Sequence, residues 1–491
     1  MAKKSNTIAI AGTIINTEGQ LISYVVEGFK ITLINTDINQ TDVVLSPDST
    51  GYIWGTVNTF DGCKAIAIFV KKNITVRTVL TFNTWNYIVL NIRVSVRDNG
   101  ALEFPGFDGI RFANGSVMSV NPCWSLHEDK EKADELNKTE KNNDKSSADT
   151  KEMYHYIVHR VYPNVKSFST VYKGETVEWV FGSNIKSSRS LDRGSYLKND
   201  VAILDIRFET KQELQTFYDF YGYVNSLLAF LIFRNGAVFE KVSLLYKDSL
   251  YGYREFADCY INTVIDYYSP NKNIDEESIE RLSRNPLNSL TVYRLSDKTF
   301  NEMFKIIAKT EKKTVDLPIN VFPKDSRDLA IFSIDKIKNI CSALEVEMDA
   351  AEIKVCKSDV LKSLIENVKN IIKNHRESSE EKLPDNTYNN MFNSISHWGD
   401  SLADRAVLAW HKHEGYLSSW SKMRFITIND DEIAEVVKAR NKITHSGFKD
   451  LDDKICETAY YIMGLIYVMA LKRVYIDDAV IKDIIAKEII G

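Results

Sequence analysis

The spacing of apolar residues changes along the chain, and this change restricts the folds that are open to it. Up to about Trp124 the apolar residues form short or alternating runs, such as Ile8–Ile15 and Tyr87–Val96, which Gly, Asn and Asp separate. This pattern is typical of short β-strands at close spacing. From about Val292 onward, apolar residues instead recur every three or four positions over long segments. We therefore expect an α+β protein, with a β-rich, sandwich-like N-terminal region followed by C-terminal helices.

The chain has 491 residues, which is too long for a single hydrophobic core. We expect a β-rich domain in two parts, 1–126 and 153–290, with a helix at 211–233 in the second part. The segment 127–152 between them is nearly all charged or small and polar, so we interpret it as a flexible insertion. Residues 291–491 form the helical domain, and its expected helices are Ser326–Asp349, Ser358–Asn374, Tyr388–Trp420, Asp430–His445 and Asp450–Ile490.

Two local features of the second β-rich part have their own interpretation. The run Phe233-Arg-Asn235-Gly236 predicts a two-residue hairpin turn. The segment Ser183–Lys198 is basic and rich in serine, with one tyrosine. We expect it to be a loop between strands, either simply solvated or in contact with phosphates.

Composition limits the classes of function. The 62 Lys and Arg residues against 67 Asp and Glu residues give a net charge of -5, which argues against a generally basic nucleic-acid coat. The six cysteines are widely scattered without a C-x-x-C pair, so reduced, mostly buried thiols are expected. The N-terminus leads into a strand-like run, and the apolar stretch Thr458–Leu471 is too short to cross a bilayer. We expect a cytoplasmic protein without a membrane partner.

Familiar catalytic and metal-binding signatures are missing from the sequence. It contains no phosphate-binding G-x-x-x-x-G-K-[S/T] loop, no G-x-G-x-x-G, no G-x-S-x-G and no H-E-x-x-H. His155 and His159 fall in a strand-like segment without a third ligand. His411 and His413 are two residues apart in a predicted helix, where their side chains diverge. We therefore expect neither a metal site nor a cofactor.

One C-terminal helix combines an arginine and a histidine near its end. Asn429 and Glu432 predict a capping box at its start, and Gly447 predicts its end. Arg440 lies on the apolar seam of this helix, seven residues after Ile433, and a guanidinium at such a position needs an acidic partner, an anion or a wet cleft. His445 follows at the carboxyl end, where the helix dipole favours its charged form. The pattern suits phosphodiester chemistry, although Arg440 paired with an acid of a neighbouring helix would explain it equally.

The run Arg440-Asn441-Lys442-Ile443-Thr444-His445 resembles the R-N-x-x-x-H motif of HEPN domains, which are α-helical bundles that often act as ribonucleases. The whole arrangement is similar to the ApeA-like anti-phage proteins, in which a β-rich region precedes a C-terminal HEPN bundle. Leu344-Glu345 and the phrase His413-Glu-Gly-Tyr-Leu417 add to this resemblance. The acidic residue that some of these enzymes place near the site is either Glu345 or Glu347.

The resemblance implies a metal-independent endoribonuclease of anti-phage defence by abortive infection. Arg440, Asn441 and His445 would be catalytic, and Lys438 and Lys442 would add positive charge for RNA binding. The implied partners are RNA, with tRNA or another translation-related RNA as a candidate, a second copy bound through the C-terminal helices, and a phage-derived trigger. The alternative is a non-catalytic HEPN scaffold or sensor that binds RNA or a phage protein. A β-sandwich carbohydrate binder fused to a helical dimeriser is a third interpretation.

Overall fold

The computed structural model describes residues 9–36, 41–57, 64–91, 104–121, 165–190, 194–261, 290–311, 314–324, 328, 333–355, 358–396, 398–399, 401–424, 428–446 and 452–488. Within these ranges it describes only the backbone at 184–201, 418–424, 441–446 and 486–488. The expected insertion at 127–152, the histidines His155 and His159, and Gly447 lie outside the described residues. The chain divides into two compact units, one of 1–232 with 236–297, the other of 233–235 with 298–491.

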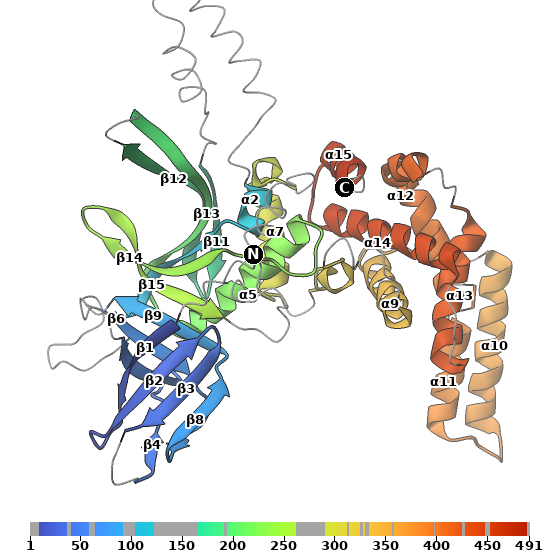
Figure 1. Cartoon of the computed structure of the whole chain (residues 1–491). Helices are drawn as coiled ribbons and strands as arrows, with labels where there is room; N and C mark the ends of the chain where they lie inside the picture. The colour runs from blue at the N-terminus through green and yellow to red at the C-terminus, as the bar shows by residue number, and fades with distance from the viewer. Residues whose placement is uncertain are drawn as a thin grey trace, which may run out of the picture. The chain divides into compact units, whose positions relative to one another are not determined.

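The first unit is built on β-strands and the second on helices, so the α+β prediction is confirmed (Figure 1). The strands are β1 (Ala9–Ile15), β2 (Leu21–Glu27), β3 (Lys30–Asn35), β4 (Val43–Leu45), β5 (Tyr52–Val57), β6 (Lys64–Phe69), β7 (Ile74–Val76), β8 (Val79–Asn83), β9 (Asn86–Asn91), β10 (Phe107–Ala113), β11 (Lys166–Tyr172), β12 (Glu175–Ser190), β13 (Gly194–Gln212), β14 (Lys241–Asp248) and β15 (Gly252–Ile261). Helices α2 (Ser116–Val120) and α5 (Leu214–Leu231) and the 3₁₀ helix η1 (Val292–Arg294) also belong to this unit.

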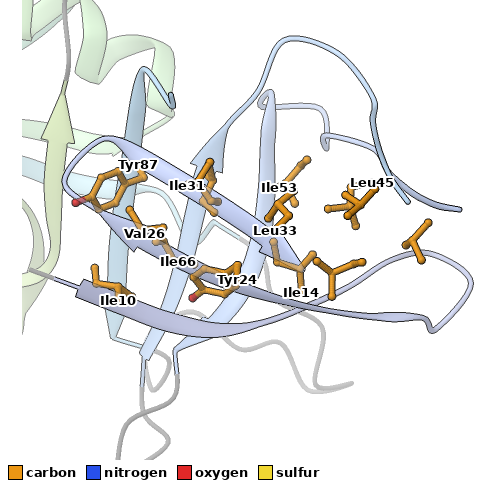
Figure 2. Packing of buried hydrophobic residues seen from close by; sticks show 14 residues of the cluster. Ile10, Ile14, Tyr24, Val26, Ile31, Leu33, Leu45, Ile53, Ile66 and Tyr87 are labelled. Carbon is orange, nitrogen blue, oxygen red and sulfur yellow. The ribbon is translucent and has the colours of Figure 1, made fainter. Parts of the chain in front are cut away.

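Thirteen of the described strands form one antiparallel sheet, in the order β11-β12-β13-β10-β14-β15-β9-β6-β5-β1-β2-β3-β8. We expected a sandwich-like module, whereas hydrogen bonding runs through this one continuous sheet, beside a two-stranded sheet of β4 and β7. At the β1–β9 end, side chains from both sheets share one core. Figure 2 shows Ile10, Tyr24, Ile66 and Tyr87 from the large sheet and Leu45 from β4 in this core. The alternating burial of β1 and β2 explains why these strands were recognisable in the sequence.

The other end of the sheet, from β10 to β13, is covered by α5. Phe220 of α5 packs against Phe208 of β13, with ring centroids 5.0 Å apart, and against Trp179 of β12 at 5.8 Å. The helix expected at 211–233 is therefore present, but Lys211 and Gln212 still belong to β13. The predicted helix thus begins about one turn too early. The spacing of apolar residues does not show where the strand ends and the helix begins.

Two local predictions in this unit are wrong. Asn235-Gly236 does not join two strands, because it follows the end of α5 and no strand precedes it. A two-residue hairpin instead joins β11 to β12 at Lys173-Gly174, where both residues have positive φ, as a type I′ turn requires. The second error concerns the expected loop at 183–198. Most of it is paired backbone of β12 and β13, with a register that reaches Ser190 opposite Gly194.

The second unit is helical over its described residues. Its elements are α7 (Asp297–Ile307), the 3₁₀ helix η2 (Ile319–Val321), α9 (Ile334–Ala350), α10 (Asp359–Ser378), α11 (Asp385–Ser396), α12 (Leu402–Arg424), α13 (Asp430–Ser446), α14 (Asp453–Arg473) and α15 (Asp478–Glu488). Two expected helices are each divided. The first breaks around Gly399, which has φ +67°, and the second at Val474 and Tyr475, where Tyr475 has φ 63°. Such left-handed backbone ends an α-helix, and a tyrosine in this conformation has no signature in the sequence.

Helix α14 forms the centre of this unit. All fourteen residues from Thr458 to Leu471 are buried, and α9, α12, α13 and α15 lie against the helix. By length and composition α14 could also cross a membrane, which corrects the expectation that this stretch is too short. The core helix of a globular domain satisfies the same criterion, and most of α14 is buried inside the protein.

A buried ion pair joins α14 to α9. The Arg473 guanidinium donates to both carboxylate oxygens of Glu347, at 3.1 Å from Nε and 2.6 Å from Nη2. The Glu347 side chain is 2% exposed, and burial raises the pKa of its carboxyl group although Arg473 opposes this shift. A charged pair at this depth is strongly destabilising to break, because removal of one partner leaves the other charge buried and unpaired.

We predict that Arg473→Met lowers the free energy of unfolding by about 3–5 kcal/mol, because the Glu347 carboxylate loses its counter-charge. Replacing both residues by Met should recover a large part of this loss. Lys362→Met is the matched control, because Lys362 pairs with a highly exposed Asp359 at 3.0 Å and its loss should cost less than about 1 kcal/mol. Urea unfolding measures all three variants. An Arg473→Met variant as stable as the control would contradict the role of the pair.

Candidate functional site

The predicted site lies on α13, and the start of this helix is as expected. The Glu432 backbone N–H donates to Asn429 Oδ1 at 3.0 Å, and the Asn429 backbone N–H donates to Glu432 Oε2 at 3.2 Å. These reciprocal hydrogen bonds confirm the capping box. The helix continues through Ser446 and so includes the backbone of Arg440, Asn441 and His445.

Helix α13 is fixed by its apolar face. Ile433, Val436 and Val437 are at most 2% exposed, and α13 packs against α9, α12 and α14. At the contact with α9, the Cys341 thiol lies 3.9 Å from the Val436 carbonyl oxygen, and burial raises the pKa of this thiol to about 11. Cys341 is thus an inert core residue at the contact between the two helices.

This packing places Arg440 opposite the first of its two candidate acids. Arg440 Nη2 lies 3.4 Å from Glu345 Oε2, and the two side chains remain 30% and 43% exposed. Glu347, two residues further along α9, is turned into the core with Arg473. The sequence left Glu345 and Glu347 open, and the structure assigns Glu345 to the surroundings of Arg440. Two residues correspond to about 200° around a helix, so one acid faces α13 while the other faces α14.

The other predicted site residues are Lys438, whose side chain is described, and Asn441, Lys442 and His445, of which only the backbone is described. Lys438 is exposed and pairs with Glu435 at 2.9 Å, and this contact raises the pKa of Lys438. Because it precedes Arg440 by two residues, it lies about 200° away around the helix. The structure therefore does not bring Lys438 together with Arg440. Asn441, Lys442 and His445 lie in the helix, but their side chains are outside the described part.

The carboxylate contacts of Arg111, Arg473 and Arg440 differ in length and burial. Arg111 binds both carboxylate oxygens of the buried Asp205 at 2.7 and 2.8 Å, and Arg473 is held as firmly by Glu347. The longer, half-exposed contact between Arg440 and Glu345 is of the kind that is worth about 1 kcal/mol or less. A guanidinium paired in this way can exchange its carboxylate for a phosphate at low cost.

The second histidine pair diverges as predicted, because α12 is a helix. His411 is exposed and its Nε2 lies 2.9 Å from Asp430. His413 is 3% exposed, and within the described part of the chain neither of its ring nitrogens has a hydrogen-bond partner. Burial lowers the pKa of His413 to about 4, and the nearby Lys472 and Lys412 lower it further, against the opposing charge of Asp478. Among the described residues, no three His, Cys, Asp or Glu side chains come together as a metal site would require.

Comparison with models of protein families, with curated proteins and with solved structures finds no match for this chain.

We predict that His413 makes the protein less stable in acid. Its pKa is lower in the folded than in the unfolded chain, so stability is complete above about pH 6.5 and is lost as the pH falls towards 4, by as much as about 3 kcal/mol. His413→Leu should remove this part of the pH dependence of urea unfolding. His411→Leu, the matched control on the exposed face, should keep it. An equal loss of stability in acid for wild type and His413→Leu would show that His413 does not titrate in this way.

Proposed function

We propose that this protein is a HEPN-type, metal-independent endoribonuclease of anti-phage defence that acts by abortive infection. The observation that carries the proposal is the position of Arg440, which a packed helix holds partly exposed to solvent beside the Glu345 carboxylate. Buried bidentate pairs explain Arg111 and Arg473 as structural residues, and this explanation does not extend to Arg440. Asn441 and His445 follow it on the same helix, in the order of the R-N-x-x-x-H motif.

In the proposed reaction the 2′-hydroxyl of the RNA attacks the adjacent phosphorus. Its proton leaves, the bond from phosphorus to the 5′-oxygen breaks, and that oxygen takes up a proton. The products are a 2′,3′-cyclic phosphate and a 5′-hydroxyl. His445 transfers protons, because an imidazole with a pKa of roughly 6.5 works in either direction at neutral pH. Arg440 leaves Glu345 to bind the non-bridging oxygens, where charge accumulates in the transition state. Asn441 hydrogen-bonds the phosphate or orients His445, and Lys442 supplies positive charge.

The remaining parts of the proposal concern partners and location. RNA is the substrate, with tRNA or another translation-related RNA as the candidate, and its cleavage stops translation in the infected cell. Two copies associate through the C-terminal helices, so that two R-N-x-x-x-H motifs share one cleft. The β-rich unit receives a phage-derived trigger. The protein works in the cytoplasm without a membrane partner, which agrees with α14 as a core helix.

One observation favours the alternative of a non-catalytic scaffold. Glu345 partly neutralises Arg440, and the net charge of the whole chain is -5, so general affinity for RNA is not expected. A scaffold would keep the Arg440–Glu345 pair as a structural contact and would bind RNA or a phage protein elsewhere. Cleavage experiments separate the two functions, because only the enzyme depends on Arg440 and His445.

We predict that His445→Ala abolishes cleavage of total cellular RNA while the protein remains folded, because it removes the residue that exchanges protons near neutral pH. Arg440→Ala should lower the rate roughly a hundredfold or more, since a charged contact to the reacting phosphate is worth about 3 kcal/mol. Arg440→Lys should restore activity only in part, because the planar fork of donors is lost. Sequencing of RNA ends, with analysis of the end groups, measures each effect.

The matched control is Arg376→Ala. Arg376 is another partly exposed arginine of the helical unit, which pairs with Asp385 at 2.8 Å. It should leave cleavage unchanged, and EDTA should also have no effect on the wild type. Equal cleavage by wild type, Arg440→Ala and His445→Ala would support the scaffold instead. Loss of activity with EDTA would rule out the metal-independent mechanism.

We predict that the active protein sediments as a dimer held together by the helical unit. The reason is that the resemblance places two motifs in one cleft, so that an isolated copy would have only half of the site. Analytical ultracentrifugation under conditions of measured cleavage provides the test. A monomer that cleaves RNA at full rate would exclude this arrangement.

A further inference from the structure

Strands β12 and β13 extend beyond the sheet that contains them. β11 pairs with β12 only up to Phe181, and β10 pairs with β13 only from Ile203 onward. Past these residues the two strands pair only with each other among the described strands, up to Ser190 opposite Gly194 (Figure 1). We call residues 183–190 and 194–201 the β-arm. Its eight residues in β12 span about 25 Å at roughly 3.3 Å per residue.

The base of the β-arm is fixed by two asparagines. Asn114 Oδ1 accepts a hydrogen bond from the Ala202 backbone N–H at 3.0 Å, and the Asn114 backbone N–H donates to the Ala202 carbonyl at 2.9 Å. The fully buried Asn121 donates from Nδ2 to the Gly182 carbonyl at 2.8 Å, and its Oδ1 accepts from the Tyr293 hydroxyl at 2.7 Å. These bonds replace the missing neighbour strands where the β-arm leaves the sheet. The base of the β-arm is therefore fixed to the sheet by these hydrogen bonds.

The sequence of the β-arm differs in charge from the rest of the chain. Residues 183–190 and 194–201 contain three cations, Lys186, Arg189 and Lys198, against the single carboxylate of Asp200, a net charge of +2. The whole chain carries -5. The same segment contains five serines, at 183, 187, 188, 190 and 195. Lysine, arginine and serine are the residues that most often contact the phosphates of nucleic acids.

The strand register groups these cations. Lys186 pairs with Asn199 and Ser187 pairs with Leu197, so Lys198 is the extra residue of a β-bulge beside Lys186. Arg189 lies opposite Ser195, one position from the end of the ribbon. One pair of cations therefore falls at the bulge and another cation near the end, along a two-stranded ribbon. Two strands alone gain little stability from pairing in water, so stability of the sheet does not explain such a long ribbon.

We infer that the β-arm binds RNA, through contacts of Lys186, Arg189 and Lys198 with backbone phosphates. The choice of RNA over other polyanions rests on the proposed function. The binding itself depends on charge and register, and it is independent of cleavage. The arm supplies a cationic segment within a chain of net charge -5, and such a segment could hold a polyanion despite the overall charge.

The test is fluorescence anisotropy with a fluorescein-labelled 20-nucleotide single-stranded RNA. The full chain carries His445→Ala, so that the RNA remains intact. Lys186→Gln, Arg189→Gln and Lys198→Gln together should raise Kd at least tenfold at 100 mM salt. Each lost contact to a single strand lowers the slope of log affinity against log salt by about 0.7, so the slope should fall by about 2. The charge-retaining set Lys186→Arg, Arg189→Lys and Lys198→Arg should bind as the parent does.

The matched control replaces Lys64, Lys71 and Lys72, three exposed lysines of β6 and of the segment directly after it, with Gln. It changes the net charge equally and should leave Kd within twofold. Equal weakening by both triple variants, or no RNA binding by the parent, would overturn the inference. So would tighter binding to duplex DNA of the same length, or arm-dependent binding to phosphatidylglycerol vesicles without binding to RNA. Melting temperatures establish that the variants are folded.

Failure of the two proposals can be told apart. If RNA binding depends on the β-arm but the protein with His445 does not cleave RNA, the β-arm inference holds and the proposed nuclease activity is wrong. If cleavage requires His445 but RNA binding does not depend on the β-arm, the nuclease proposal holds and the β-arm inference is wrong.

Discussion

Burial of α14 is the constraint on which the helical unit depends. A helix that is apolar on all sides cannot face water, so it must be enclosed by other helices. α9, α12, α13 and α15 each cover part of it. The ion pair of Arg473 with Glu347 lies in the same packed region and joins α14 to α9. Because α9 and α13 are both set against α14, their separation is fixed, and with it the distance from Glu345 to Arg440.

The candidate site therefore combines a rigid backbone with a partly exposed charge. The apolar residues of α13 fix the backbone, whereas Arg440 keeps almost a third of its side chain exposed and has a carboxylate at 3.4 Å. The Glu345 carboxylate gives the guanidinium a counter-charge beside the apolar face of α13. This contact is longer and more exposed than the contact of Arg111 with Asp205. Such a pair is compatible with exchange for phosphate, on which the proposed mechanism relies.

The β-rich unit is held together differently, by one continuous hydrogen-bonded sheet. The β1–β9 end encloses its own core, and the β10–β13 end is covered by α5. Beyond this cover, β12 and β13 continue paired only with each other among the described strands, and Asn114 and Asn121 bond to the backbone where they leave the sheet. Polar side chains thus replace strand neighbours where the apolar cover ends, and this allows a hydrophilic ribbon to extend from a folded sheet.

Local patterns of the sequence were sufficient to predict the α+β class, the helix α5 and the capping box of Asn429 and Glu432, because these features depend on residues a few positions apart. They could not choose between Glu345 and Glu347, which lie 95 and 93 positions from Arg440, since only the packing of α9 shows which acid faces α13. The predicted hairpin turn at Asn235-Gly236 is absent, because the pair follows helix α5 and not a strand. The neighbouring Phe233 packs against Phe322 and Tyr467, which are distant in the sequence. The sequence predicts a loop at 183–198 because serines and lysines lack the apolar alternation of a strand. The pairing of the β-arm comes from backbone hydrogen bonds, which are the same for every side chain and therefore leave little trace in the sequence.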